Sequence, residues 1–487
     1  MLDISRDKVP TMAQLKEAVD QFEMLMINHL QLYTEHTFAY TGHEDVWQHA
    51  SPMTPDEVRD LDAYCRERGI ELAANQNCLG HLHRWLNLPR YAPLAEILSA
   101  DTKWTFESDD GRKFDRTGPH SLCPTDPRSL EFIRGLLDQL LPCFSSPLVN
   151  IGCDEAFDVG QGRSREAVAS RGRAAVYFEW LRAVDEIVKS HGKRSLFWAD
   201  IALRHPESLD QIPDGATPLA WGYEDAEPFH AAFSAFRRRD RKPWMCPGTS
   251  SWLSMTGRTR VRRANIDGAA ARARDGMLIT DWGDRGHRQH WPIALYSIAH
   301  GAHAAWRGEA HASPFDPRAA ALHLFGDESG DLGIWLDELG EVDADLSRGL
   351  RNTNALFTEL HRPLSDLPAG TKQRGSQAEW EAVRERLGAL RDRLDAMPGE
   401  AMPPLVRSEL EHTLWVAEHA ADKAIVCRAE PGLIPRAPAR IRLAADMGAI
   451  AEEHRALWPR RNRPGGLDDS ATHYERIVED YEHPGGA

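Results

Sequence analysis

Short apolar runs alternate with segments of helical periodicity over about the first 305 residues. A bounded apolar run of this length is typical of a buried strand, whereas apolar positions that recur every three or four residues predict an amphipathic helix. We expect eight strands, at 1–5, 29–36, 70–77, 148–155, 195–200, 217–223, 244–251 and 277–284. Helical spacing separates them, as at 12–26 and 175–192. The pattern predicts an α/β fold, a (β/α)8 TIM barrel.

The polar residues within these runs favour a barrel over a doubly wound sheet. In nearly every run the apolar residues come first, and polar or aromatic residues gather at the C-terminal end. Barrel enzymes use that end of many strands, whereas a doubly wound sheet concentrates its chemistry at one switch point. Thr54-Pro55 and Thr125-Asp126-Pro127 are typical of capped helix starts with proline in the first turn.

The strand signal ends near residue 308, and helical patterns with interleaved charge follow, as at 379–397 and 403–429. We therefore predict a catalytic barrel over 1–308 and a C-terminal helical domain over 309–487. A length of 487 residues also exceeds the usual size of one domain. Helical tails of barrel hydrolases pack on the barrel, roof the active site or form a homodimer, and the sequence leaves these three uses open.

Composition and charge exclude several classes of protein. A formal net charge of −16 disfavours nucleic-acid binding, which needs a basic face. No run approaches the roughly 18 apolar residues of a membrane span, and the first ten residues do not resemble a signal peptide, so we expect a cytoplasmic location. The seven cysteines are scattered without a CxxC pair, which predicts buried free thiols rather than a zinc site or disulfides.

Two adjacent carboxylates, Asp154 and Glu155, close the fourth predicted strand directly after Gly152 and Cys153. Side chains alternate along a strand, so both carboxylates reach one pocket only if the strand ends or bends there. Close carboxylates push their pKa values apart, which leaves one protonated as an acid and the other ionised. A glycoside hydrolase needs one protonated and one ionised carboxylate, and we predict that Asp154 and Glu155 are catalytic.

Aromatic residues at other strand ends predict a sugar pocket. Indole rings stack on the apolar CH faces of sugars, although a single tryptophan is more often part of a core. Three tryptophans end predicted strands and a fourth follows one closely, and polar residues accompany them. The predicted substrate-binding residues are Glu35, Asn77, His81, Trp198, Trp221, Tyr223, Trp252, Trp282 and Asp284.

Histidines near strand ends, at His36, His81, His287 and His290, raise the alternative of a metal-dependent barrel hydrolase. No HxH or HExxH spacing accompanies them. We therefore predict no metal and no cofactor, and interpret His81 as a hydrogen-bonding or structural residue of the pocket.

Together these residues resemble glycoside hydrolase family 20, the β-N-acetylhexosaminidases. The Gly-x-Asp-Glu end of the fourth strand is the most specific element, and LDISR, the Gly-His of NQNCLGH, FWAD and DWGD match less specific ones. The likeness covers the barrel and, more loosely, WPRRNRPGGLDDS at 458–470. It is similar to the intracellular hexosaminidase D-like branch, which also has no signal peptide and favours galactosaminides.

The resemblance implies an exo-acting, retaining hydrolase whose partner is a glycan with a terminal β-linked GalNAc or GlcNAc. In this family the acetamido oxygen of the substrate attacks the anomeric carbon and forms an oxazoline. Glu155 would protonate the leaving oxygen and later activate water, and Asp154 would orient the acetamido group. Trp198, Trp221 and Trp282 would wall the sugar subsite, and Asp284 would bind outer hydroxyls.

Two elements of the family pattern have no direct counterpart. An arginine usually precedes the LD of the first strand, but the sequence begins at Met1 within that strand, after the place of a small α/β domain. Arg6 has the wrong spacing for this role. The seventh predicted strand offers no tyrosine for the acetamido carbonyl, and Tyr223 on the sixth is our candidate. The missing arginine motivates one alternative, a non-catalytic sugar-binding protein of the same fold.

Overall fold

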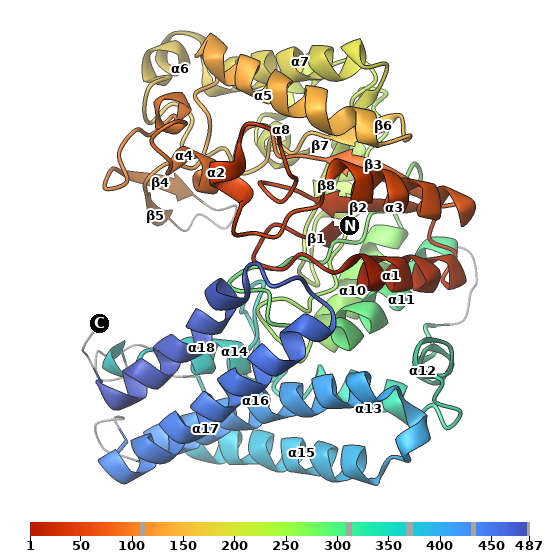
Figure 1. Cartoon of the computed structure of the whole chain (residues 1–487), viewed down its shortest axis with the longest axis vertical. Coiled ribbons are helices and arrows are strands. Elements are labelled where there is room, and N and C mark those ends of the chain that lie inside the picture. The colour runs from red at the N-terminus through yellow and green to blue at the C-terminus, as the bar shows by residue number, and fades with distance from the viewer. Residues whose placement is uncertain (108–112, 308–313, 367–373, 430–434, 485–487) are drawn as a thin grey trace.

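The computed structural model describes residues 1–107, 113–307, 314–366, 374–429 and 435–484. A curled parallel sheet and its surrounding helices form the upper part of the molecule in Figure 1, and long helices form the lower part. The arrangement confirms the predicted fold class, a TIM-barrel type of α/β fold followed by a helical region.

Seven parallel strands form the main sheet, in the order β1-β2-β3-β6-β7-β8-β9. Their bounds are β1 Leu2–Asp3, β2 His29–Tyr33, β3 Glu71–Asn75, β6 Leu148–Asn150, β7 Arg194–Trp198, β8 Thr217–Trp221 and β9 Trp244–Cys246. Each coincides with one of the predicted runs, but the charged residues at the ends of the runs, such as Glu35, Asp154, Glu155 and Asp200, lie beyond the regular pairing. Those residues are therefore free to leave the sheet and line a site.

The eighth predicted strand is a bridging segment rather than a regular strand. Met277 makes a parallel bridge to Met245, beside β9, and Asp281 makes one to Leu2 of β1. The backbone N–H of Asp281 also donates to the carbonyl of Met1 at 3.0 Å. Because this segment moves from one partner to the other within five residues, it joins the two edges of the curled sheet without a continuous ladder.

Helices surround the sheet between successive strands (Figure 1). They are α1 Met12–Met24, α2 Glu44–Trp47, α3 Pro55–Glu67, α4 His83–Leu86, α5 Pro127–Leu140, α6 Arg165–Arg171, α7 Arg173–Ser190, α8 Asp200–Leu203, α9 Phe229–Arg237, α10 Thr259–Ala270 and α11 Trp291–Arg307. An antiparallel hairpin of β4 Lys103–Glu107 and β5 Lys113–Thr117 projects from the loop between β3 and β6.

Two helix starts confirm the predicted capping pattern. The Thr54 hydroxyl accepts the backbone N–H of Glu57 at the start of α3, with Pro55 in the first turn. Asp126 caps α5 in the same way, followed by Pro127. Both caps satisfy backbone donors that the first turn of a helix leaves unpaired.

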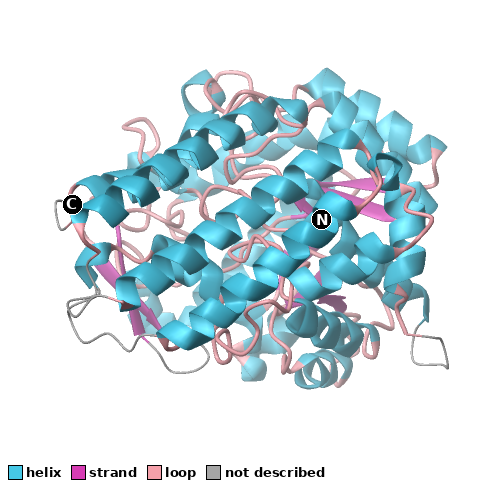
Figure 2. Cartoon of the chain, turned by 90° about the horizontal axis from the view of Figure 1, so that it is seen from below, coloured by secondary structure: helices cyan, strands magenta, loops and turns pink. Residues whose placement is uncertain are grey.

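The helical region has its own apolar core. Its helices are α12 Pro317–Phe325, α13 Asp331–Leu339, α14 Ala355–His361, α15 Gln377–Ala396, α16 Pro404–Arg428, α17 Ala437–Leu457 and α18 Leu467–Glu482. Long helices cover the molecule when it is seen from below (Figure 2). The predicted domain boundary between 308 and 309 lies outside the described residues and stays a prediction. In the part of the chain that the structure describes, no helix is long and apolar enough to cross a membrane.

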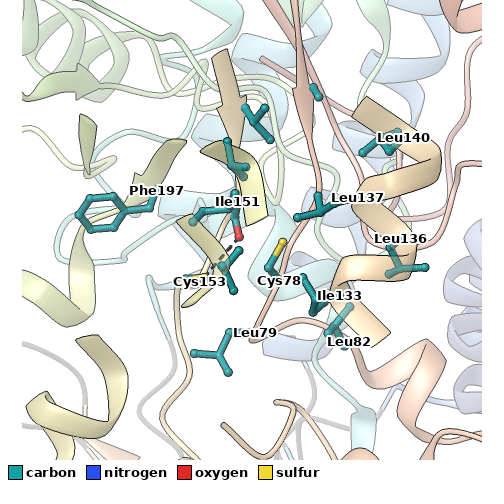
Figure 3. Packing of buried hydrophobic residues seen from close by; sticks show 14 of the residues in the cluster. Cys78, Leu79, Leu82, Ile133, Leu136, Leu137, Leu140, Ile151, Cys153 and Phe197 are labelled. Carbon is teal, nitrogen blue, oxygen red and sulfur yellow. Dashed lines mark hydrogen bonds between the residues drawn. The ribbon is translucent and has the colours of Figure 1, made fainter. Parts of the chain in front are cut away.

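An apolar core supports the loop after β6. Leu137 and Ile133 of α5 point toward Cys78 (Figure 3), and Cys153 belongs to the same cluster of buried residues. The thiol of Cys153 donates to the carbonyl of Ile151 at 3.4 Å. All seven cysteines are buried and free, as the sequence predicted. The carboxylate pair therefore follows immediately on well-packed backbone.

Candidate active site

Charged side chains from five loops meet at one end of the barrel. Each comes from a loop that follows a strand or the bridging segment, and these are Arg6 after β1, Glu35 after β2, His81 after β3, Asp154 and Glu155 after β6, and Asp284 after 277–281. This is the C-terminal end of the strands, where barrel enzymes place their chemistry. The structure thus brings together predicted site residues that lie far apart in the sequence.

The backbone turns sharply at the end of β6. Gly152, Cys153 and Glu155 have positive φ angles of 65°, 68° and 48°. Such angles are uncommon for residues other than glycine and often occur at functional sites. A Cβ on Gly152 would lie 2.6 Å from the side chain of Asn77, so glycine is needed there. The turn explains how two adjacent carboxylates reach one pocket.

Asp154 is held from two sides. The Asn77 amide donates from Nδ2 to Asp154 Oδ1 at 2.8 Å, and His81 Nε2 lies 3.3 Å from Oδ2. Burial alone would raise the pKa of this carboxyl, but His81 and the Asn77 hydrogen bond hold it below its usual value. Asp154 is therefore an ionised acceptor with a fixed orientation.

Glu155 is the more exposed carboxylate, with 42% of its side chain accessible to solvent. Its Oε2 lies 3.4 Å from His81 Nε2, and its backbone N–H donates to Asp200 Oδ2 at 3.0 Å. Burial would raise the pKa of Glu155, but the neighbouring His81 lowers it below its usual value in the empty site. The carboxylate stands where a ligand would shield it from water.

His81 connects the carboxylates to the rest of the site. Its Nε2 faces Asp154 and Glu155, and its Nδ1 lies 3.2 Å from a guanidinium nitrogen of Arg6. Burial alone would lower the pKa of His81, but Asp154 and Glu155 raise it well above its usual value. The cluster therefore holds a proton between its two carboxylates at neutral pH.

Arg6 is the centre of the polar side of the site. Its guanidinium pairs with Asp284, and its Nε lies 3.6 Å from Glu35 Oε1. The same guanidinium lies over the ring of Trp282, 5.1 Å from the centroid. The Tyr33 hydroxyl donates to Glu35 at 2.8 Å. Alternating donors and acceptors of this kind match the hydroxyl groups of a sugar.

The predicted aromatic residues form one connected cluster. Trp221, which is half-buried, stacks on Tyr223 at 5.3 Å, and the indole N–H of Trp282 donates to the Tyr223 hydroxyl at 2.7 Å. Trp198 lies 5.9 Å from Trp282, and Trp252 packs edge-on against Tyr223. Trp198 and Trp252 are almost fully buried, so their contact with sugar stays a prediction.

Three residues of the site were outside the predicted set. Arg6 lies three residues after β1, where no periodic signal marks it. Tyr33 precedes Glu35 by two positions, a spacing that places both on one face of a strand, and this signal was available. Asp200 ends the fifth predicted run, and burial followed by the charge of Asp154 raises its pKa well above the usual value.

No three His, Cys, Asp or Glu side chains in the described ranges are grouped as a metal site would require.

Comparisons with known proteins place the chain in a family. The model of the glycosyl hydrolase family 20 catalytic domain matches residues 1–274, more than half of the chain. A β-hexosaminidase of Vibrio furnissii is 25% identical over 174 residues, which cover 34% of this chain and 26% of that protein. Hexosaminidase D of Bos taurus is 22% identical over 223 residues, covering 44% of this chain and 59% of that protein.

A solved structure shows a similar fold. The family 20 exo-β-N-acetylglucosaminidase from Vibrio harveyi, in complex with N-acetylglucosamine, has a TM-score of 0.50 and 16% sequence identity. The match covers 70% of this chain and 58% of that chain. This chain thus spans only part of the length of each of these relatives.

Proposed function

We propose that this chain, which belongs to glycosyl hydrolase family 20, hydrolyses terminal β-linked N-acetylhexosamines from the non-reducing ends of glycans. The observation that carries the proposal is the pair Asp154 and Glu155, both within 3.4 Å of His81 Nε2 at the C-terminal end of the barrel. The pair offers one fixed, ionised carboxylate and one carboxylate that a substrate would cover. This is the division of roles that substrate-assisted hydrolysis needs.

The fixed carboxylate suits the internal nucleophile. Asp154 would accept the N–H of the acetamido group and turn its carbonyl oxygen toward the anomeric carbon. That oxygen forms a bond to the anomeric carbon while the glycosidic bond breaks, which gives an oxazoline. The hydrogen bond from Asn77 to Asp154 and the ion pair of Asp154 with His81 support this role, because a near-attack geometry depends on a carboxylate that does not rotate.

Glu155 would transfer the proton. As general acid it protonates the leaving oxygen, and as general base it then takes a proton from the water that opens the oxazoline with net retention. A neutral sugar over Glu155 would remove water from its exposed side chain and favour the protonated form. His81, which lies 3.4 Å from Glu155 and lowers its pKa in the empty site, would favour the ionised form that acts as general base in the second step.

The remaining residues would hold the sugar. Arg6, Glu35 and Asp284 would bind its outer hydroxyls, and Trp221 and Trp282 would contact its CH faces. Removal of one sugar at a time follows if these groups close the far end of the subsite. GalNAc and GlcNAc differ only at one hydroxyl. The ratio of the rates at which the two sugars are released will therefore report on how Arg6, Glu35 and Asp284 bind hydroxyls.

Release of nitrophenol from aryl β-GalNAc and β-GlcNAc substrates tests the proposal. The wild type should cleave at least one of them, and Glu155→Gln should lose about 10²–10⁴-fold on substrates with poor leaving groups. Glu131→Gln, an exposed change on α5, is the matched control and should keep full activity. Sugar binding without turnover would instead favour a non-catalytic sugar-binding protein, and loss of activity with a chelator would favour a metal-dependent hydrolase.

A further inference from the structure

We propose that residues 461–470, which join α17 to the first turn of α18, are a clasp that positions the sugar-hydroxyl side of the site. Arg463 and Ser470 are its positioning residues. The stretch, coloured deep blue, runs along the border between the barrel and the helices (Figure 1). Only the effect of the clasp on sugar binding rests on the proposed function.

Arg463 ties together two loops of the barrel. Its backbone N–H donates to the carbonyl of Val9 at 2.9 Å, and its Nε donates to Pro10 at 3.1 Å. Its two terminal nitrogens reach Pro52 at 2.8 Å and Glu57 at 2.9 Å. Val9 and Pro10 belong to the loop after β1, and Pro52 belongs to the loop after β2. One largely buried guanidinium therefore fixes these loops relative to each other.

Two glycines let the clasp approach the same loops closely. A Cβ on Gly466 would lie 1.7 Å from the carbonyl oxygen of Asp7, and one on Gly465 would lie 2.4 Å from the backbone of Ala50. The backbone N–H of Gly465 also donates to the Ser51 hydroxyl at 3.0 Å. No other residue would allow the main chains this close, so the approach is a specific feature of the sequence.

Ser470 holds the loop after the bridging segment. Its hydroxyl donates to the carbonyl of Gly286 and accepts from His454 Nε2. Four residues further along the same loop, His290 contacts His412 of α16 through ring nitrogens 2.9 Å apart. The helical region thus holds residues 286–290 at two points, directly after Asp284.

These three loops carry the polar side of the site. Arg6 lies on the first, Glu35 on the second and Asp284 on the third, and Arg6 contacts both carboxylates. Asp3 reinforces the link, because its Oδ2 accepts the backbone N–H of Gly283 at 3.0 Å. Movement of one loop against another would therefore change the distances between the groups proposed to bind hydroxyls.

Hydrogen bonds and ion pairs, and not apolar packing alone, join the barrel to the helical region. A cavity of about 60 Å³ lies between barrel and helices, and polar side chains such as Lys8, Asp281, Glu409 and Arg461 line it. Arg461 donates to Glu409 at 2.7 Å and to Gln14 at 2.6 Å. Hydrogen bonds and ion pairs set orientation more strictly than apolar area does, which suits a positioning role.

The test compares two substrates in each of three variants, Arg463→Ala, Ser470→Ala and the control Arg391→Ala. Arg391 pairs with Glu418 at 2.6 Å between α15 and α16, within the helical region. The substrates are an aryl β-N-acetylhexosaminide and its 4-deoxy analogue. The ratio of their kcat/KM values measures recognition of the hydroxyl and does not depend on the fraction of folded enzyme.

We expect this ratio to fall by about tenfold in Arg463→Ala and Ser470→Ala, because small displacements of binding groups are costly. It should stay unchanged in Arg391→Ala and recover partly in Arg463→Lys. A ratio that stays at the wild-type value in both clasp variants overturns the proposal.

Amide hydrogen exchange gives a readout that does not need turnover. The clasp predicts faster exchange in residues 5–10 and 283–290 of both clasp variants than in Arg391→Ala. Equal exchange in all three variants also overturns it. If the wild type cleaves neither substrate, the proposed function fails, and the exchange rates still decide whether the clasp exists.

Discussion

Replacing Asn77 by alanine tests whether Asp154 depends on a neighbouring strand for its orientation. Asn77 is fully buried, and its amide donates to Asp154 at 2.8 Å and accepts the backbone N–H of Cys153 at 3.2 Å. The first contact is a hydrogen bond to a charged group, about 1.5–3 kcal/mol, and losing the second leaves a buried N–H unpaired, about 1–3 kcal/mol. We expect Asn77→Ala to lower the free energy of unfolding by roughly 3–5 kcal/mol at neutral pH.

This loss should depend on pH, because the stronger contact needs an ionised Asp154. The pKa of Asp154 is lowered in the folded state, against the effect of burial, by His81 and Asn77. Stability from a carboxyl with a lowered pKa is fully present above the unfolded value, about 3.9, and is lost as pH falls through the folded value. The difference between wild type and Asn77→Ala should therefore shrink below about pH 4.

Urea unfolding at pH 7 and below pH 4 measures this difference. Asn75→Ala is the matched control, because Asn75 lies two residues earlier, is also buried, and donates to the neutral Gln31 at 3.0 Å. Its loss of stability should be the same at both pH values. Turnover of an aryl hexosaminide should fall about 10²-fold in Asn77→Ala only. An unchanged kcat, or a stability loss as independent of pH as that of Asn75→Ala, would refute the reasoning.

Substitutions at three further positions probe neighbouring groups. His81→Gln removes the group that lowers the pKa of the general acid Glu155, so the alkaline decline of kcat/KM should move to higher pH, and an unmoved decline contradicts this role. Tyr223→Phe removes the partner of the Trp282 indole and the proposed donor to the acetamido carbonyl, so kcat should fall about 10²-fold, and a normal rate excludes Tyr223. Asp200→Asn should leave the melting temperature nearly unchanged, since burial and Asp154 raise the pKa of Asp200 and keep it protonated. Asp200→Ala should destabilise by about 1–3 kcal/mol, because the Glu155 N–H loses its acceptor, and equal melting temperatures for the two variants would argue against this.

The barrel and the carboxylate pair could be predicted because their signals are local. A strand that ends in polar residues is visible within eight positions, and the run before Asp154 and Glu155 has this form. The position of the pair in a parallel sheet then follows from strand direction alone. The sequence showed only that the chain must bend after β6 if both carboxylates are to reach one pocket. The positive φ of Cys153 makes this bend, and it could not be predicted because nothing in a cysteine at this position indicates such an angle.

The polar side of the site could not be predicted in the same way. Arg6 and Asp284 are 278 residues apart, and their contact exists only because 277–281 bridges to β1. The tryptophans show a related limit. A strand-end position predicted that Trp198 faces the pocket, yet its exposure of 0% depends on how tightly Trp282 and other neighbours pack around it. Burial is a property of the assembled barrel rather than of the strand.

The balance of charge in the site bears on how it would favour the reaction over simple binding. Four carboxylates, those of Glu35, Asp154, Glu155 and Asp284, surround the cations Arg6 and His81. When Glu155 carries a proton as general acid, three negative groups still face these cations. A neutral sugar gains little from such a field, whereas positive charge develops on the sugar ring and the acetamido group as the glycosidic bond breaks. Groups fixed before the reaction that interact more strongly with the transition state than with the substrate raise kcat rather than affinity. The contacts of Asn77 with Asp154, and of the clasp with the loops that carry Arg6 and Asp284, hold these charges in place, so the preference for the transition state depends on the rigidity of both.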